Sequence, residues 1–283
     1  MYKIIKKVSL NPTVTLMDIY APLIAKKAEP GQFIILRVND EGERMPLTIA
    51  DYDRVRGTVT VIFQIVGATT ELLNHKNEGE YITDFVGPLG KATHTKGLKR
   101  VAVVGGGVGS AIAYPVAKKL HSEGAVVHSV IGFRSKELVI LEDEFGAVSD
   151  KLVIMTDDGS YGEKGLVTNA LKALIESGEE YDEVIVIGPL IMMKFVCLLT
   201  KEYGIKTTVS MNPIMIDGTG MCGGCRLTVG GEVKFACVDG PDFDGHLVDF
   251  DEAMERSAMY RPTERNDYDK ACKLIPKEGK RDA

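Results

Sequence analysis

The sequence has no tryptophan and few aromatic residues, and none of its apolar runs approaches the roughly 20 residues that span a bilayer. Its first residues, MYKIIKKVSL, lack the continuous apolar core of a signal peptide. Basic residues form no stripe with interleaved aromatics, and the formal net charge is -6 at pH 7. We therefore expect an acidic cytoplasmic protein, with neither a membrane nor a nucleic acid as its partner.

Cysteine is also scarce, but its distribution is informative. The chain has five cysteines, and Cys222, Cys225 and Cys237 lie in one short segment. An odd count with a tight cluster indicates metal ligation in a reducing compartment rather than disulfides. Cys197, in an apolar helical run, is expected to be a buried small side chain, and Cys272, in the polar tail, a free thiol.

The pattern of apolar residues divides the 283-residue chain into three segments. Residues 1–98 contain short, partly alternating runs such as GQFIILRV and TVTVIFQIV between turn-forming stretches, which predicts an antiparallel β-barrel. Residues 99–211 alternate apolar strand-like runs, among them KRVAVVGGG and DEVIVIGP, with helical stretches. That alternation predicts a doubly wound parallel sheet in an α/β domain.

The third segment, residues 212–283, is too small to hold a core without help. It contains the cysteines, then the hairpin-like run CRLTVGGEVKFACV that turns at Gly230 and Gly231, then a polar tail. We expect metal ligation to stabilise this small lobe. The tail begins as an amphipathic helix, which is expected either to dock a partner or to pack on its own chain.

A glycine-rich turn follows the first strand of the α/β segment. In VAVVGGGVGSAIAYP, a buried strand leads through Gly105, Gly106, Gly107 and Gly109 into a helix, so that backbone amides and the helix N-terminus can bind a phosphate. A packing turn without a ligand would have the same sequence. The next strand lacks the terminal acidic residue that usually binds the ribose, which predicts a variant nicotinamide site.

Other strand ends of this segment should meet the glycine turn at one edge of the sheet. Arg134, with Ser135 and Lys136, would favour NADP by binding its 2′-phosphate, or would form an exposed basic turn. Residues Asp157 and Asp158, and Gly188 and Pro189, follow two further strands at the same edge, where each pair is a candidate ligand contact or a loop.

The cysteine segment reads DGTGMCGGCRLTV and ends with Cys237 across the hairpin. Three thiolates leave a four-ligand site one short. Asp217 precedes Cys222 at the x4 spacing of plant-type 2Fe–2S loops, so the pattern D-x4-C-x2-C…C predicts Asp217 as the fourth ligand. A structural zinc on the same four side chains is the competing hypothesis.

These features together resemble the ferredoxin-reductase superfamily over nearly the whole chain. They are most similar to the small subunits of NADH-dependent ferredoxin:NADP oxidoreductases, also called sulfide dehydrogenase subunits, and to the electron-transfer subunits of B-type dihydroorotate dehydrogenases. The stretches that carry this resemblance are GERMPLTIAD, VGPLGKA, VVGGGVGSAIAYP, MTDDGSYGEKGLVT and MIDGTGMCGGCRLTV.

The resemblance implies FAD in the barrel and suggests which residues contact it. One departure is that many relatives have an arginine where this chain has Met45, with Arg44 one position earlier. The residues that the resemblance assigns to FAD are Arg44, Pro46, Leu47 and Thr48, then Ile62, Phe63 and Gln64 along the flavin edge, and Gly67, Thr69 and Thr70 near the pyrophosphate.

Asp217 also distinguishes the two branches, since the dihydroorotate-type subunits have a fourth cysteine there. The resemblance to the ferredoxin:NADP branch implies NAD(H) on this chain. It also implies a large glutamate-synthase-like partner with a bifurcating flavin and 4Fe–4S clusters, through which ferredoxin and NADP react.

The function expected from this resemblance is electron transfer between NAD(H), FAD, a 2Fe–2S cluster and the large partner. Hydride transfer depends on cofactor positioning, so no catalytic side chain is expected, and none of the five histidines stands out as a general base. The alternatives are an electron-transfer subunit of a B-type dihydroorotate dehydrogenase, and a zinc-stiffened nucleotide-binding module without redox activity.

Overall fold

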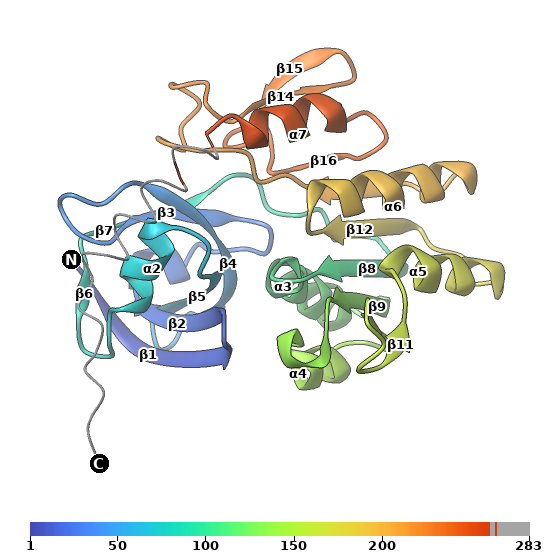
Figure 1. Ribbon diagram of the computed structural model, residues 1–283, viewed down its shortest axis with the longest axis horizontal. Coiled ribbons are helices and arrows are strands. Elements are labelled where there is room, and N and C mark those ends of the chain that lie inside the picture. The colour runs from blue at the N-terminus through green and yellow to red at the C-terminus, as the bar shows by residue number, and fades with distance from the viewer. Residues whose placement is uncertain (261–263, 265–283) are drawn as a thin grey trace.

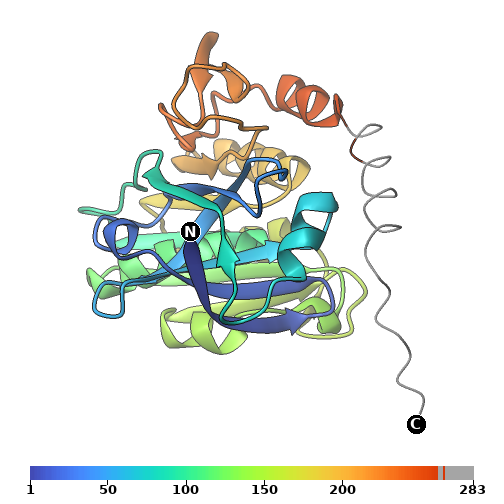
Figure 2. The same cartoon turned by 90° about the vertical axis from the view of Figure 1, so that its left-hand side faces the viewer.

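The computed structural model describes residues 1–260 and 264, which form three lobes (Figure 1). The C-terminal lobe lies above the other two in both views (Figures 1 and 2). Within the described residues, no helix is both long enough and apolar enough to cross a membrane.

The first lobe is a seven-stranded antiparallel sheet that curls into a barrel, as the sequence predicted, with strand order β6-β1-β2-β5-β4-β3-β7. Its alternating strands divide their side chains between two environments. On β5, Phe63 points into the barrel core, whereas Ile62 packs in a buried cluster with the neighbouring lobe. The elements of this lobe are β1 (Tyr2–Asn11), β2 (Val14–Tyr20), α1 (Pro22–Ala25), β3 (Phe33–Arg37), β4 (Met45–Asp53), β5 (Thr58–Gln64), α2 (Ala68–Asn74), β6 (Tyr81–Ile82) and β7 (Asp84–Leu89).

The second lobe confirms the predicted doubly wound sheet. Helices α3 and α4 cover one face of the sheet, and α5 and α6 cover the other. The residues of β8 alternate between the two faces: Val101 and Val103 face α3, while Ala102 and Val104 face the opposite side. Its elements are β8 (Arg100–Gly106), α3 (Gly109–Ser122), β9 (Val126–Phe133), η1 (Lys136–Leu138), α4 (Glu142–Ala147), β10 (Lys151–Thr156), β11 (Glu163–Lys164), α5 (Val167–Glu176), β12 (Glu183–Ile187), α6 (Leu190–Glu202) and β13 (Thr207–Ser210).

The strand order of this sheet is β11-β10-β9-β8-β12-β13-β16. The chain reverses its direction of winding between β8 and β12, so the turns that follow these strands open side by side at the carboxyl edge. The sequence analysis did not identify β13, whose four residues, TTVS, are too few to show the alternation of a strand.

The third lobe contains the predicted hairpin of β14 (Arg226–Val229) and β15 (Glu232–Phe235), followed by β16 (Asp242–Asp244) and α7 (Phe250–Ala258). The two hairpin-turn glycines have φ of 61° and 81°, as a type I′ turn requires. Strand β16 pairs antiparallel with β13, so a strand from 212–283 completes the sheet of residues 99–211. The expected boundaries between the three segments stay predictions.

The helix expected at the start of the tail is α7, which packs against α6 through an ion pair of 2.6 Å between Lys194 Nζ and Asp251 Oδ1. This contact agrees with a helix packed on its own chain. The rest of the tail beyond residue 264, including Cys272, lies outside the described residues.

Candidate functional site

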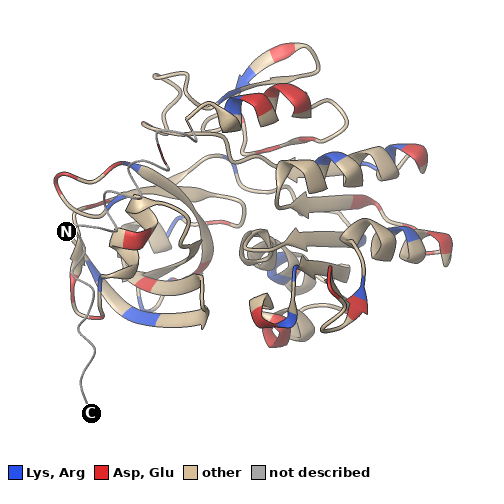
Figure 3. Cartoon of the chain, viewed as in Figure 1, with Lys and Arg blue, Asp and Glu red and all other residues tan. Residues whose placement is uncertain are grey.

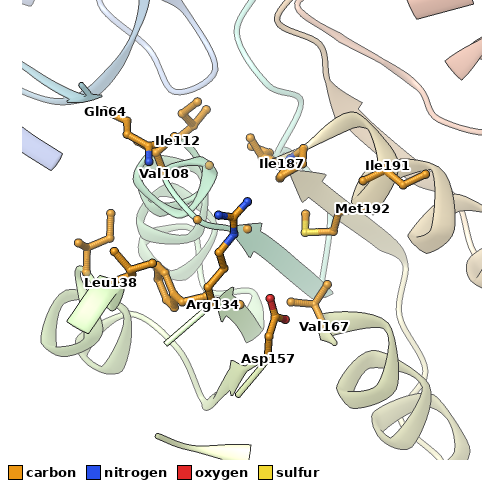
Figure 4. A pocket seen from close by; sticks show the side chains of 18 of the residues that line it. Gln64, Val108, Ile112, Arg134, Leu138, Asp157, Val167, Ile187, Ile191 and Met192 are labelled. Atoms are coloured by element: carbon orange, nitrogen blue, oxygen red, sulfur yellow. The ribbon is translucent and has the colours of Figure 1, made fainter. Parts of the chain in front are cut away.

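A cavity of about 760 Å³ lies between the barrel and the carboxyl edge of the α/β sheet (Figure 4). The barrel contributes the turn between β1 and β2 and the strands β4 and β5, and the sheet contributes the turns after β8, β9, β10 and β12. This volume is typical of a small-molecule or cofactor site. The residues predicted from the sequence that line it are Thr48, Gln64, Gly106, Gly107, Gly109, Arg134, Asp157, Gly188 and Pro189.

The glycine turn after β8 is shaped by two close approaches. A Cβ on Gly109 would lie 2.6 Å from the Ile187 carbonyl oxygen, and one on Gly106 would lie 2.4 Å from Met192 Sδ. Gly107, at φ +55°, instead faces open space. Helix α3, which starts here, has no side-chain N-cap and no acidic residue in its first turn, so its positive end is available to an anion.

Arg134 and Asp157 are the charged side chains among the residues that line the cavity. Both point into it, from the ends of β9 and β10, beside one another (Figure 4). Asp158 does not line the cavity, because its Oδ1 accepts hydrogen bonds from the Ser160 hydroxyl at 2.6 Å and the Ser160 amide at 2.9 Å. The Ser160 bonds lower the pKa of the Asp158 carboxyl below its ordinary value.

Other residues expected at the site lie elsewhere. Phe63 fills the barrel core, and the Thr70 hydroxyl accepts the amides of Val66 and Gly67 at the start of α2. Arg44 donates from Nε to the Ile216 carbonyl oxygen at 2.9 Å, in the cysteine lobe. The other predicted residues that do not line the cavity are Pro46, Leu47, Ile62, Gly67, Thr69 and Gly105.

The sequence analysis missed several residues that line the cavity. Asn11 and Thr13, in the first hairpin of the barrel, lie at its rim, and Asn11 Nδ2 donates to the Leu138 carbonyl oxygen at 3.2 Å across the two lobes. Ser210 ends β13 and Asn212 lies two residues beyond it, so recognising that strand would have placed both at the carboxyl edge. No local pattern marks Asn11, because its partner is 127 residues away.

The structure brings two of the three clustered thiols together. Cys225 and Cys237 are buried with their Sγ atoms 3.2 Å apart, while Cys222 is exposed on the same loop. Burial and the neighbouring Cys225 thiol raise the pKa of Cys237 to about 12, so metal binding would have to displace its proton.

Asp217 is oriented by the loop itself. Its Oδ1 accepts the Thr219 amide at 3.0 Å, and its Oδ2 accepts the Cys222 amide at 2.8 Å. These backbone bonds lower the pKa of the carboxyl, which keeps it ionised as a ligand must be. Asp217 is the one charged residue of the segment 211–225, and the loops of the C-terminal lobe are almost entirely tan in Figure 3.

The candidate ligands occur as two pairs, and this arrangement fits a two-iron cluster. In a 2Fe–2S cluster each iron takes its own pair of protein ligands. Cys225 and Cys237 form one close pair, and the Cys222 amide links Cys222 to Asp217.

A carboxyl with a buried oxygen links the C-terminal lobe to the segment between barrel and sheet. Asp242 on β16 accepts the Thr93 hydroxyl at 2.5 Å, from the segment between barrel and sheet, while its Oδ1 is buried without a partner in the described structure. Burial raises the pKa of Asp242 to about 6. The junction therefore holds a carboxyl that is poorly solvated when ionised.

Comparisons with known proteins agree with this architecture. The family model for the iron–sulfur cluster binding domain of dihydroorotate dehydrogenase B matches residues 212–249. A dihydroorotate dehydrogenase B (NAD(+)) electron transfer subunit homolog of Thermotoga maritima is 46% identical over 271 residues, 96% of this chain and 95% of that protein. An uncharacterised protein of the adh 3′ region of Clostridium beijerinckii is 54% identical, over 93% of this chain and 92% of that protein.

Among solved structures, a chain of the NADH-dependent reduced ferredoxin-NADP oxidoreductase, studied for flavin-based electron bifurcation, superposes with a TM-score of 0.90. It is 45% identical, and the match covers 95% of this chain and 97% of that one. The fold and the cysteine lobe therefore define a flavin and iron–sulfur oxidoreductase subunit of the ferredoxin-reductase type, which confirms the predicted resemblance. The chain belongs to the family of dihydroorotate dehydrogenase B electron-transfer subunits and their homologues.

Proposed function

We propose that this chain transfers electrons between NAD(H) and a large partner subunit, using FAD in the barrel and a 2Fe–2S cluster in the C-terminal lobe. The complex would be an NADH-dependent ferredoxin:NADP oxidoreductase that bifurcates electrons. The partner would be a glutamate-synthase-like subunit with a flavin and 4Fe–4S clusters, where ferredoxin and NADP react. The clustered free thiols suit the reducing conditions of the cytoplasm.

One observation carries this proposal: of two neighbouring barrel strands, one lines the cavity and the other contacts the cysteine loop. Thr48 of β4 lines the cavity, and its partner in the pairing is Phe33 of β3. Two positions along β3, Ile35 lies against Gly218 of the cysteine loop. A flavin bound at β4 would thus lie next to the nicotinamide cavity, and one strand away from the contact with the cluster loop.

The residues of the chain have separate tasks in this reaction. The open backbone at Gly107 and the N-terminus of α3 would bind the pyrophosphate of the dinucleotide. Arg134 and Asp157 would bind its more distant ribose, and Thr48 and Gln64 would hold the flavin from the barrel side. The apolar side chains of Ile112 and Met192 line the cavity and exclude water from the reacting rings.

Asp217, Cys222, Cys225 and Cys237 would hold the cluster. FAD, when bound, accepts a hydride from NADH, and the cluster accepts electrons one at a time. The contribution of the protein is positioning, so no side chain of this chain needs to donate or remove a proton.

The test is the visible spectrum of anaerobically purified protein, with iron and sulfide analysis, before and after NADH is added. Flavin and 2Fe–2S absorption that bleaches with NADH is the expected result. A colourless protein with stoichiometric zinc and no labile sulfide would overturn the proposal. Copurification with a dihydroorotate-oxidising subunit, instead of a glutamate-synthase-like one, would favour the dihydroorotate branch.

A further inference from the structure

The cysteine loop is held against the barrel on both sides of Asp217. On one side, Arg44 Nε donates to the Ile216 carbonyl oxygen at 2.9 Å. On the other side, Gly218 lies so close to the barrel that an added Cβ would be 2.6 Å from Ile35 Cδ1 and 2.8 Å from Leu89 Cδ1. Two barrel contacts therefore fix the backbone of the residue between them.

The side chain of Asp217 links its own fixed backbone to the residues that follow it in the loop. Its two carboxylate oxygens accept the amides of Thr219 and Cys222. Moving the backbone at Ile216 or Gly218 would move the carboxylate, and with it the Cys222 amide. Arg44 is thus connected to Cys222 in two steps: its side chain donates to the Ile216 carbonyl oxygen, and the carboxylate of the next residue, Asp217, accepts the Cys222 amide.

Arg44 itself is well placed for this task. It directly precedes β4, whose Thr48 lines the cavity, so its backbone moves with the strand that we propose for the flavin. Its planar guanidinium directs Nε–H toward a carbonyl with little freedom. The contact joins segments 172 residues apart in the sequence.

We propose that Arg44 is a positioning residue for the iron–sulfur centre: it fixes the Ile216–Cys222 segment, and hence Asp217, on the flavin barrel. This inference rests on the proposed function and deepens it. It replaces the role at the flavin phosphate that the family resemblance suggests for Arg44. The two roles predict different losses when the side chain is removed.

The experiment compares Arg44→Gln with the matched variant Arg54→Gln in the full chain. Arg54 is also a barrel arginine that donates to a backbone carbonyl, that of Ala28 at 3.0 Å, but its bonds stay within the barrel. For each variant we would measure FAD content and affinity, the electron paramagnetic resonance spectrum of the reduced cluster, and the rate of iron release to a chelator.

For Arg44→Gln we expect shifted g-values and iron release faster by about fivefold, as the loss of one hydrogen bond to a charged donor would give. Its FAD affinity should stay within about twofold of wild type, and Arg54→Gln should match wild type in every measurement. Wild-type cluster properties in Arg44→Gln would overturn the inference. So would loss of FAD in that variant, whatever happens to the cluster.

A second measurement does not need the cluster. In the metal-free chain, Arg44→Gln should increase amide hydrogen exchange in residues 216–222 and leave β4 unchanged. Unchanged exchange there would contradict a positioning role. If wild-type protein binds neither flavin nor cluster, the proposed function fails while this exchange result still reports on the Arg44 contact.

Discussion

The cavity edge and the cysteine loop are built in different ways. At the cavity, each ligand-facing turn is placed by the strand directly before it, and the parallel sheet brings the turns together. The cysteine loop has short-range ligand spacing, but its position depends on Arg44, Ile35 and Leu89, which lie more than one hundred residues earlier. Local sequence thus specifies the chemistry of both regions and the placement of only the first.

The largest expected effect tests whether the close thiol pair anchors the cluster. Cys225→Ser should remove nearly all iron and labile sulfide, because only a thiolate suits that buried position. The control is Cys197→Ala, a buried cysteine in α6, which should keep the cluster and cost about 1 kcal/mol of stability. If Cys225→Ser kept its full content of iron and labile sulfide, the close thiol pair would not be what anchors the cluster.

A substitution in the glycine turn should affect the cavity and spare the cluster. Gly109→Ala places a Cβ 2.6 Å from the Ile187 carbonyl oxygen, so the turn must shift, and we expect NADH affinity to fall at least about tenfold. The matched control is Gly146→Ala in α4, where the added methyl meets nothing within 4 Å. Titration with NADH measures both, and equal affinities in the two variants would count against a phosphate-binding turn.

The charged pair in the cavity should set the choice of nucleotide. Asp157→Asn removes a negative charge from the wall, so the ratio of kcat/KM for NADPH to that for NADH should rise about tenfold. Arg134→Ala should lower the same ratio. Steady-state rates with an artificial one-electron acceptor test both variants. An unchanged ratio in both would show that these residues do not bind the ribose.

The smallest effect concerns the junction between the two regions. The folded-state pKa of Asp242, about 6, exceeds its unfolded value near 3.8. The folded state thus keeps a proton that the unfolded chain releases, so this group makes stability fall as pH rises from about 4 to 6.

Asp242→Asn should remove that fall. It should stabilise the metal-free chain at pH 7.5 but not at pH 4, by about 1 of the roughly 3 kcal/mol that a two-unit shift allows, because the Asn amide is also costly to bury. Urea unfolding at the two pH values measures the difference. Asp244→Asn, on the exposed part of the same strand, is the control. A stability gain that is equal at both pH values would show that burial of the charge is not the cause.

Much of the fold could be predicted because the apolar pattern alone distinguishes the segments. The strand period of two in the barrel and the strand–helix alternation after Lys99 need no tertiary information. The glycine turn and the cysteine spacing were found for the same reason. Asp157 and Asp158, however, could not be separated, because only the hydrogen bonds from Ser160 turn one of them away from the cavity.

What could not be predicted depends on contacts between distant segments. Asn11 lines the cavity because the first barrel hairpin meets the segment after β9. Arg44 resembled a phosphate ligand by motif, and its contact with Ile216 appears only when barrel and cysteine lobe are packed. Asp242 lies in a polar stretch that reads as surface, and its burial follows from the pairing of β16 with β13.

That pairing has a consequence for synthesis. Strand β13 would present an open edge to solvent, and unpaired edges invite chains to associate. The strand that covers it, β16, follows Cys237 in the chain. A nascent chain therefore cannot cover the edge of β13 until every cysteine of the cluster has been translated. The short strand that protects this edge and the ligands for iron are thus completed in the same stretch of translation.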